Sequence, residues 1–530
     1  MQTPPEVLAT SSEGTRNSDK TQGNPLIPPP MVVRMMGAAV LILFLCSSLR
    51  HALFQSTAWD LGIFDQVVYL ISQGQPPISS FLGFHILGDH ASGILYPLAL
   101  FYKIYPDLHW LLAVQALALA LGAWPTWSLA CLAGLNYGQA VAVVAVYLLY
   151  PVVFNLNLFD FHPDVIALPA LLGAILAARL SRPFWFVAAI ILVLSCKEIF
   201  SLTVVAIGFW LLAFEKQSFS RSKVLRYGMA GFAIAAGIAW FLVVTQGIIP
   251  FFKGSETGGV ERYAYLGHSV LEIGLNLLLK PGLVFGKILS IDTFKYLLLL
   301  CLPVFWGLAP KYWTPLIMAL PTLGLNVLSQ DPFQRSLAYQ YSLPVIPFLL
   351  LAVLSQAEGQ KQTLATTDSL DARDKKTGFP GLTASNAKAS SGIFSRFPIP
   401  SLQFPRSIIV WSLLMFLILG KYPQLGLYMT RLNTWQATRE AIAQISPQSS
   451  VLTDNRLATH LSHRPDIKLL SQVVPDTDLT AFQAILLNLR HPWPDTQAIG
   501  AQFAEKLKTN PNFKVSYQRD EVWLFTRVAP

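Results

Sequence analysis

Long apolar runs alternate with short polar segments along most of the chain. A run of about 20 apolar residues forms a helix that crosses about 30 Å of hydrocarbon, so such runs indicate membrane spans. We expect about eleven spans, at residues 35–52, 109–133, 139–157, 164–180, 184–196, 199–214, 228–247, 294–309, 312–328, 343–356 and 407–422. The pattern therefore predicts a mainly α fold, a polytopic transmembrane helical bundle.

The expected spans 184–196 and 199–214 are separated only by Lys197 and Glu198. The segments before and after these spans are short and basic, which keeps both on the cytoplasmic side and requires two crossings between them. At 1.5 Å per residue the two helices rise only about 20 and 24 Å, less than the hydrocarbon core of about 30 Å. The break at Lys197 and Glu198 should therefore lie below the outer surface, where charges usually face an interior path or a partner.

This topology puts the N-terminus inside and the C-terminal region outside, and it divides the chain into five regions. They are a disordered cytoplasmic tail (1–33), a transmembrane part with its outer loops (34–356), a flexible cytoplasmic linker (357–406), the last span (407–422) and a small outer α/β domain (423–530). In the last region we expect helices near 435–445 and 496–507, and strands at 451–454, 484–489, 513–517 and 522–526. No nucleotide-binding glycine loop occurs in it, so we interpret it as a lid or docking domain.

Composition supports the membrane class and limits the partners. The chain has 530 residues, of which 53% are hydrophobic and 13% charged, whereas soluble chains carry about 25% charged residues. The net charge of +9 is scattered and suits basic cytoplasmic loops, so we expect membrane lipid and no nucleic acid as a partner. The four cysteines lie in or beside apolar runs without a CxxC pair, which argues against a disulfide framework or a thiol metal site.

Two acids lie in the first outer loop, in the sequence WDLGIFDQVVYLISQGQ. A helix over residues 61–72 has one apolar and one polar face, and Asp65 lies on the polar face. We expect this amphipathic helix to lie at the membrane interface. Asp60 does not share that face, and it is either the N-cap of the helix or a functional acid.

Further ionisable residues lie at the mouths of other spans on the same outer side. They are His85, Asp89 and His90 in the first loop, Asp160 and His162 in the second, the pair Lys197 and Glu198, and Arg335 with Tyr339 in a later loop. Acid and imidazole side chains together can ligate a divalent metal, hold a phosphate or transfer a proton, and an arginine can bind a phosphate bidentately. Each group also has a structural interpretation, as a hydrogen-bonded loop or an interfacial anchor, and the metal and cofactor stay undefined. The stronger observation is that all these residues are expected on the same, outer side of the membrane. We expect the site to centre on the buried pair Lys197 and Glu198.

At these residues the chain resembles a large bacterial family of uncharacterised polytopic membrane proteins, a domain-of-unknown-function family. The matching stretches are WDLGIFDQ, GDHASGILYPLALFY, FDFHPDVIALP, KEIFSL and YSLPVIPFLL, within residues 50–355. That family is in turn similar to the GT-C membrane glycosyltransferases, which use a polyprenyl-phosphate sugar donor and an acid in the first outer loop. The resemblance implies Asp60 or Asp65 as the catalytic acid or base. This chain departs from the family at Ile199, where relatives have an acid, and at Gln340, where they have a histidine.

We therefore expect a multi-pass protein of the plasma (inner) membrane that moves a sugar from a polyprenyl-phosphate donor to an acceptor on the outer face. Asp60 or Asp65 would act as the base or orient a metal, and the other outer residues would bind the substrates and neutralise the departing phosphate. Two alternatives remain, a transporter or flippase of a lipid-linked or small solute, and a non-catalytic envelope-assembly protein. Convergence of Asp65, His90, His162 and Lys197 beneath the C-terminal domain, in a cavity open to lipid, would strongly favour the transferase hypothesis.

Overall fold

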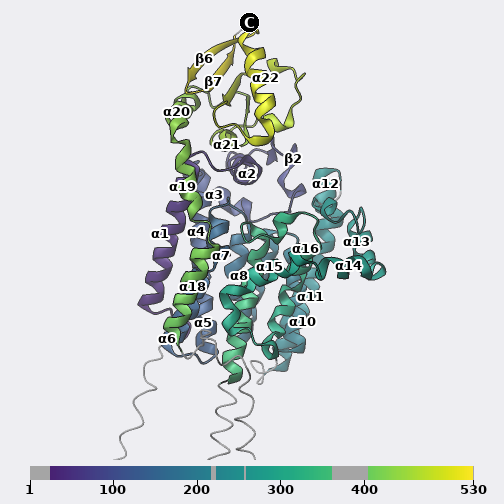
Figure 1. Ribbon diagram of the computed structural model, residues 1–530. Coiled ribbons are helices and arrows are strands. Elements are labelled where there is room, and N and C mark those ends of the chain that lie inside the picture. Colours follow the sequence, from purple (N-terminus) through teal and green to yellow (C-terminus); the bar gives the residue numbers. More distant parts are fainter. Residues whose placement is uncertain (1–23, 216–221, 256–257, 361–403, 529–530) are drawn as a thin grey trace, which may run out of the picture.

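The computed structural model describes residues 24–215, 222–255, 258–360 and 404–528. Residues 1–23 of the expected tail and residues 361–403 of the expected linker lie outside the described residues. The helices of the membrane part run side by side as a bundle, and a small sheet-containing unit lies beyond one end of it (Figure 1). The mainly helical fold predicted from the apolar runs is confirmed.

Six helices among the described residues are long and apolar enough to cross a membrane. They are Pro30–Ala52 (α1), His109–Leu132 (α4 and α5), Tyr137–Asn157 (α6 and α7), Lys223–Lys253 (α11 to α12), Gln340–Gln360 and Pro405–Ala443 (α18 to α20). A seventh span results if Pro281–Ile288 and Ile291–Gly307, which meet at a bend of 50°, are counted together. Length and composition therefore give six or seven spans. The expected count of about eleven would require that shorter helices also cross the membrane.

Those shorter helices include the pair around Lys197. Helix α8 (Asp164–Arg179) precedes α9 (Pro183–Cys196) and α10 (Phe200–Ala213), which are interrupted at Lys197 and Glu198 as predicted. Helix α11 (Lys223–Val243) packs tightly against α10, because a Cβ at Gly208 would come within 2.6 Å of Ile234 and one at Gly237 within 2.7 Å of the Ser201 carbonyl oxygen. Small residues of this kind let helix backbones approach closely in a membrane. The broken pair is thus held rigidly in the bundle.

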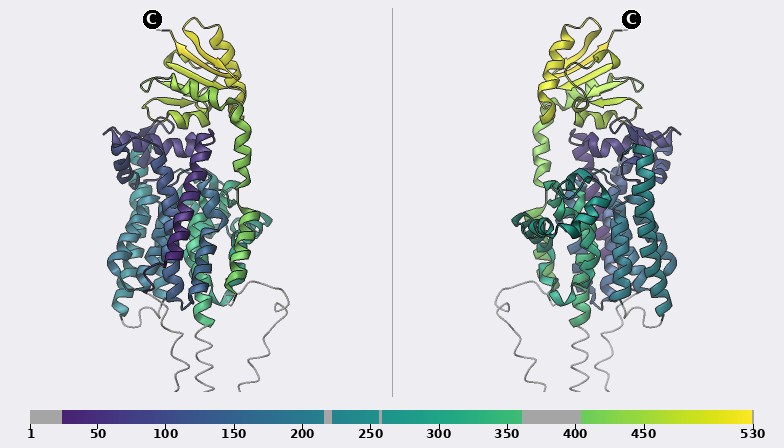
Figure 2. Two further views of the ribbon diagram at one scale, coloured as in Figure 1. Left: turned by 90° about the vertical axis from the view of Figure 1, so that its left-hand side faces the viewer. Right: turned by 90° about the vertical axis from the view of Figure 1, so that its right-hand side faces the viewer.

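The loop between α1 and α4 lies between the bundle and the C-terminal unit (Figures 1 and 2). It contains a π-helical turn η1 (Ala58–Gly62), helix α2 (Ile63–Ser72), the short antiparallel strands β1 (Ile78–Ser79) and β2 (Phe84–His85), and helix α3 (Leu95–Ile104). Helix α2 was expected at the membrane interface, with Asp65 on its polar face, and that polar face is covered by protein. Both faces of α2 are buried, and Asp65 is only 1% exposed, because the C-terminal unit covers the polar side.

Residues 248–293, which lie between two expected spans, contain apolar helices. Helix α12 (Ile249–Lys253) is followed by α13 (Val270–Leu279), α14 (Pro281–Ile288) and α15 (Ile291–Cys301). Figure 1 shows α13 and α14 projecting sideways from the bundle. Neither α13 nor α14 contains a buried residue, although both are rich in leucine.

The C-terminal sheet unit (residues 435–528) is a mixed five-stranded sheet of order β4-β3-β5-β7-β6. Its strands are β3 (Val451–Thr453), β4 (Ile467–Leu469), β5 (Ala484–Asn488), β6 (Phe513–Arg519) and β7 (Val522–Arg527), with helices α20 (Trp435–Ala443), α21 (Asn455–Ala458) and α22 (Gln497–Lys508). Strands β4, β3 and β5 are parallel, and β5, β7 and β6 are antiparallel. All four predicted strands are present. The sequence pattern did not indicate β4, which has only three residues and lies at the edge of the sheet.

Candidate active site

Asp60 lies in the π-helical turn η1, a rare element that is often found at functional sites. Its Oδ1 is 3.0 Å from Nε2 of His162, and its side chain is 24% exposed. Nδ1 of His162 is 3.2 Å from the carbonyl oxygen of Asp160. Both ring nitrogens of His162 therefore lie within hydrogen-bond distance of an oxygen, one of Asp60 and one of the backbone. The two residues form an acid–imidazole pair.

The charges around this pair favour the ionised carboxylate. Burial alone would raise the pKa of Asp60, but His162 and the more distant Lys197 and Arg50 hold it below its ordinary value. Asp60 is therefore ready to accept a proton at neutral pH.

The turn η1 is held from both sides. Asp160 accepts hydrogen bonds from the backbone N–H of Thr57 at 3.1 Å and from its hydroxyl at 2.8 Å, and it forms a buried ion pair with Arg50 of α1. On the other side, Oδ1 of Asn455 accepts a hydrogen bond from the backbone N–H of Ala58 at 2.8 Å. Asp160 therefore supports the turn, and Asn455, which the sequence did not single out, supports it from the C-terminal sheet unit.

Lys197 and Glu198 form a second polar group with residues of two other loops. Nζ of Lys197 is 3.2 Å from Asp164, and Nδ1 of His90 is 3.1 Å from Glu198 and its Nε2 is 3.9 Å from Asp89. Burial would lower the pKa of His90, but Asp89 and Glu198 outweigh it and raise the pKa above the ordinary value. The structure thus brings His90 and Asp89 of the first loop to the break between α9 and α10.

This group forms the polar end of a cavity of about 320 Å³ in the bundle. Arg262, Tyr341 and Gln340 also line it, and most of the remaining wall is apolar, from α10, α11, α13 and α16 (Leu320–Leu328). Within the part of the chain that the structure describes, Oε1 of Gln340 is buried without a hydrogen-bond partner. At the polar end the cations Lys197 and Arg262 lie beside the acids Asp164 and Glu198. A cavity with apolar walls and one charged end fits an amphiphile with a charged head.

Three predicted residues point elsewhere. His85 stacks on Phe252 and accepts a hydrogen bond from the backbone N–H of Leu87. Arg335 donates to the carbonyl oxygens of Val327 and Ser329 near the end of α16, and Tyr339 packs edge-on against Phe159 and Phe333. None of the three lines the cavity of about 320 Å³, and neither do Asp60, Asp65 and His162. Of the four residues expected to converge in one cavity, only His90 and Lys197 line this one, whereas Asp65 lines another. Arg262 also lines the cavity of about 320 Å³, but nothing in its sequence context distinguished it from an ordinary loop arginine.

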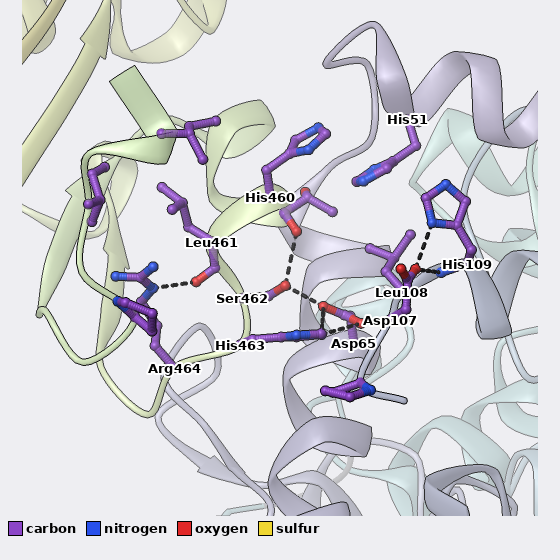
Figure 3. A pocket seen from close by; sticks show the side chains of 15 residues that line it. His51, Asp65, Asp107, Leu108, His109, His460, Leu461, Ser462, His463 and Arg464 are labelled. Atoms are coloured by element: carbon purple, nitrogen blue, oxygen red, sulfur yellow. Dashed lines mark hydrogen bonds and ion pairs between the residues drawn. The ribbon is translucent and has the colours of Figure 1, made fainter. Parts of the chain in front are cut away.

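Asp65 lies in a different environment, which Figure 3 shows. Its carboxylate accepts hydrogen bonds from the hydroxyls of Tyr102, at 2.5 Å, and Ser462, and it pairs with Nε2 of His463 at 3.1 Å. Burial would lower the pKa of His463, but Asp65 raises it above the ordinary value. Ser462 and His463 belong to the C-terminal sheet unit, so their contact with Asp65 joins that unit to the bundle.

A second cavity, of about 400 Å³, lies beside Asp65. Its lining includes His51, Asp107, His109 and His460 (Figure 3). The rings of His51 and His460 stack at 3.9 Å, and burial lowers the pKa of His460 to about 4. Among the described residues no three His, Cys, Asp or Glu side chains are arranged as a metal-binding group.

The fold and these contacts define a multi-pass membrane protein with a polar site where outer loops, bundle and C-terminal sheet unit meet. The chain belongs to the family described as "Predicted membrane protein (DUF2079)", which matches residues 50–524. The resemblance predicted from the motifs is confirmed. No protein with a curated description matches the chain.

Solved structures of ArnT from Cupriavidus metallidurans are similar to the chain. The apo structure has a TM-score of 0.50 and 15% identity, and the structure bound to undecaprenyl phosphate has a TM-score of 0.49 and 14% identity. Both comparisons cover 94% of this chain and 98% of ArnT. At this identity the similarity to apo ArnT concerns the fold alone.

Proposed function

We propose that this protein is a membrane glycosyltransferase that moves a sugar from a polyprenyl-phosphate donor to an acceptor at the outer face of the membrane. The observation that carries the proposal is the Asp60–His162 pair, whose carboxylate is stabilised by the charge of Lys197, a residue that lines an apolar cavity in the bundle. The GT-C-like fold agrees with it. Within the cavity, Lys197 and Arg262 are the cations that face a lipid phosphate.

Asp60 is the better candidate for the base of the two acids. Hydrogen bonds and ion pairs among the described residues occupy only Oδ1 of Asp60, whereas both oxygens of Asp65 are taken. A general base needs a free lone pair directed at the proton it accepts. We assign the base to Asp60 and a docking role to Asp65.

In the proposed reaction the acceptor hydroxyl gives its proton to Oδ2 of Asp60 while its oxygen forms a bond to the anomeric carbon of the sugar. The bond from that carbon to the phosphate oxygen breaks, and the polyprenyl phosphate leaves with the electron pair. Lys197 and Arg262 stabilise the negative charge of the leaving phosphate. His162 orients Asp60 and keeps it ionised before the transfer.

The proposed topology has eleven crossings, with the N-terminus in the cytoplasm and the C-terminal sheet unit outside the plasma membrane. The interrupted helices α9 and α10 support it, since they count as two crossings that meet at the site. Reporter fusions after residues 182, 222 and 528 test it: alkaline phosphatase should be active only at 528, and activity at 182 would overturn the topology.

A complementation experiment tests the function. In a strain whose glycoconjugates change when the gene is deleted, the wild-type chain and Asp65→Glu should restore them, and Asp60→Asn should not, at equal membrane levels of protein. Restoration by Asp60→Asn would overturn the proposal. The alternative of a non-catalytic assembly factor predicted outer acids and histidines dispersed in solvent, and the burial of Asp65, His162 and Glu198 argues against it.

A further inference from the structure

Helix α13 has two apolar faces. Val270, Ile273, Gly274 and Leu277 recur at the spacing of one helical face and line the cavity of about 320 Å³. A second face is formed by Leu271, Leu275, Leu278 and Leu279, whose side chains are between 52 and 81% exposed. A helix on the surface of a soluble protein buries its apolar stripe and turns a polar face outward, so the second face of α13 requires another apolar surrounding.

The polar residues of α13 do not provide an outward polar face. Glu272 accepts a hydrogen bond from the backbone N–H of His268 at 2.8 Å, and Asn276 donates to the carbonyl oxygen of Leu266 at 2.5 Å. Both side chains are thus turned back onto the segment that leads into the helix.

The exposed apolar surface continues beyond α13. Its further members are Leu283, Phe285, Leu289, Ile291 and Phe294. Exposed apolar patches larger than a few hundred Å² mark membrane or protein contacts. Figures 1 and 2 show α13 and α14 beside the bundle and well away from the C-terminal sheet unit, and α14 forms with the following helix the bent pair that is apolar enough to span a membrane.

Lysines at the edge of this surface indicate which apolar partner covers it. Lys280 lies between α13 and α14, and Lys287 of α14 lies over the ring of Tyr265 at 5.4 Å. Lysine and tyrosine side chains flanking an apolar surface are typical of the membrane interface, where the apolar stem lies in hydrocarbon and the charge reaches a headgroup. Bilayer lipid fits this combination.

We propose that α13 and α14 are embedded in lipid, and that α13 is the wall between the bilayer and the cavity. A lipid chain enters past α13 and lies along Val270, Ile273, Gly274 and Leu277, with its anionic head at Lys197 and Arg262. The inference deepens the proposed function. The identity of the lipid head as a sugar phosphate rests on that function, whereas the position of α13 between bilayer and cavity does not.

A substitution at Gly274 tests the wall. A Cβ at Gly274 meets no atom within 4 Å, so Gly274→Trp extends into the cavity without displacing backbone, and a larger residue favours the helix over glycine. The probe is undecaprenyl phosphate, titrated onto the full chain in nanodiscs. Gly274→Trp should weaken its binding at least tenfold, whereas Gly274→Ala and the outward-facing control Leu278→Trp should stay within twofold of wild type.

Unchanged binding of undecaprenyl phosphate by Gly274→Trp would contradict the proposal that α13 is the wall of the cavity. Equal losses of binding in Gly274→Trp and Leu278→Trp would also contradict it. If the probe binds and Gly274→Trp blocks it, but no sugar is transferred, the wall stands and the transferase proposal fails. If Asp60→Asn abolishes transfer and Gly274→Trp leaves binding intact, the wall alone fails.

The lipid contact is tested with spin labels at positions 275 and 289, each in turn, in nanodiscs. Both labels should be more accessible to oxygen than to a water-soluble nickel complex. Greater accessibility to nickel would mean that the surface faces water, and strong dipolar coupling between two chains would mean that a second copy covers it. Either result would overturn the proposal.

Discussion

The two acids of the first outer loop are five residues apart, but their surroundings differ. Asp60 lies in a π-helical turn with one oxygen bound to His162 and the side chain 24% exposed. Asp65 lies in α2 with both oxygens bound and almost no exposure. A carboxylate that accepts a proton needs a free oxygen, whereas one that joins two parts of a protein needs donors from both. The same residue type therefore serves two purposes according to what covers it.

The sharpest way to separate the two acids is Asp60→Asn. The amide keeps the size of the side chain and can still contact His162, but it cannot accept the acceptor's proton. We expect sugar transfer to fall by about 10²- to 10⁴-fold, with the thermal unfolding temperature unchanged. Sugar transfer within a fewfold of wild type, measured on purified protein or by complementation, would show that Asp60 is not the general base.

Asp65→Ala should act on stability instead. It leaves the buried hydroxyls of Tyr102 and Ser462 and the ring of His463 without their acceptor, and breaking a buried pair of this kind costs about 3–5 kcal/mol. We expect faster proteolysis of the C-terminal sheet unit. Asp107→Ala is the matched control, because Asp107 pairs with His109 near the surface and its loss should have little effect.

A smaller effect is expected at Asn455, which connects the C-terminal sheet unit to the turn that carries Asp60. Asn455→Leu leaves the N–H of Ala58 without its acceptor, at a cost of about 1–3 kcal/mol, and should speed amide exchange across residues 57–62. Asn455→Asp retains an acceptor oxygen and should protect these amides nearly as well as wild type. Equal exchange in the two variants would show that the bond does not position the turn.

The smallest expected effect is the pH dependence of the docking at Asp65. His463 has a raised pKa in the folded state, so its stabilising contribution is full below its ordinary value of 6.5 and is lost as the pH rises through the folded-state pKa. Asp65, Asp107 and Arg464 are the charged groups around it, and His460, with a pKa of about 4, stays neutral over this window. Protease resistance of the C-terminal sheet unit should decrease slightly above pH 6.5 in the wild type and be flat in His463→Gln.

The membrane part and some of the site could be predicted from the sequence because they depend on local patterns. Hydropathy located the helices, and the basic flanks required the break at Lys197 and Glu198, which the structure contains. The candidates His162, Asp60, His90 and Glu198 could be assigned to one end of the bundle from the topology. Their pairing, His162 with Asp60 and His90 with Glu198, was found only in the structure.

The remainder depends on contacts between distant segments. Ser462 and His463 reach Asp65 from about 400 positions away, and no local pattern indicates this. The polar face of α2 was recognised, but the unit that covers it cannot be inferred from the helix itself. Arg335 satisfies nearby carbonyl groups instead of a ligand, because a buried helix end needs donors as much as a phosphate does.

The hydrogen bond from Ala58 to Asn455 also has a consequence for how the protein is made. The ribosome produces Asp60 early, while Asn455 follows almost four hundred residues later, after the bundle's helices have been synthesised. Throughout that interval the turn lacks its second support. A nascent or prematurely terminated chain can therefore occupy the membrane while the turn that carries Asp60 lacks its hydrogen bond to Asn455. Under the proposed function, activity would begin only when the C-terminal sheet unit has folded onto α2.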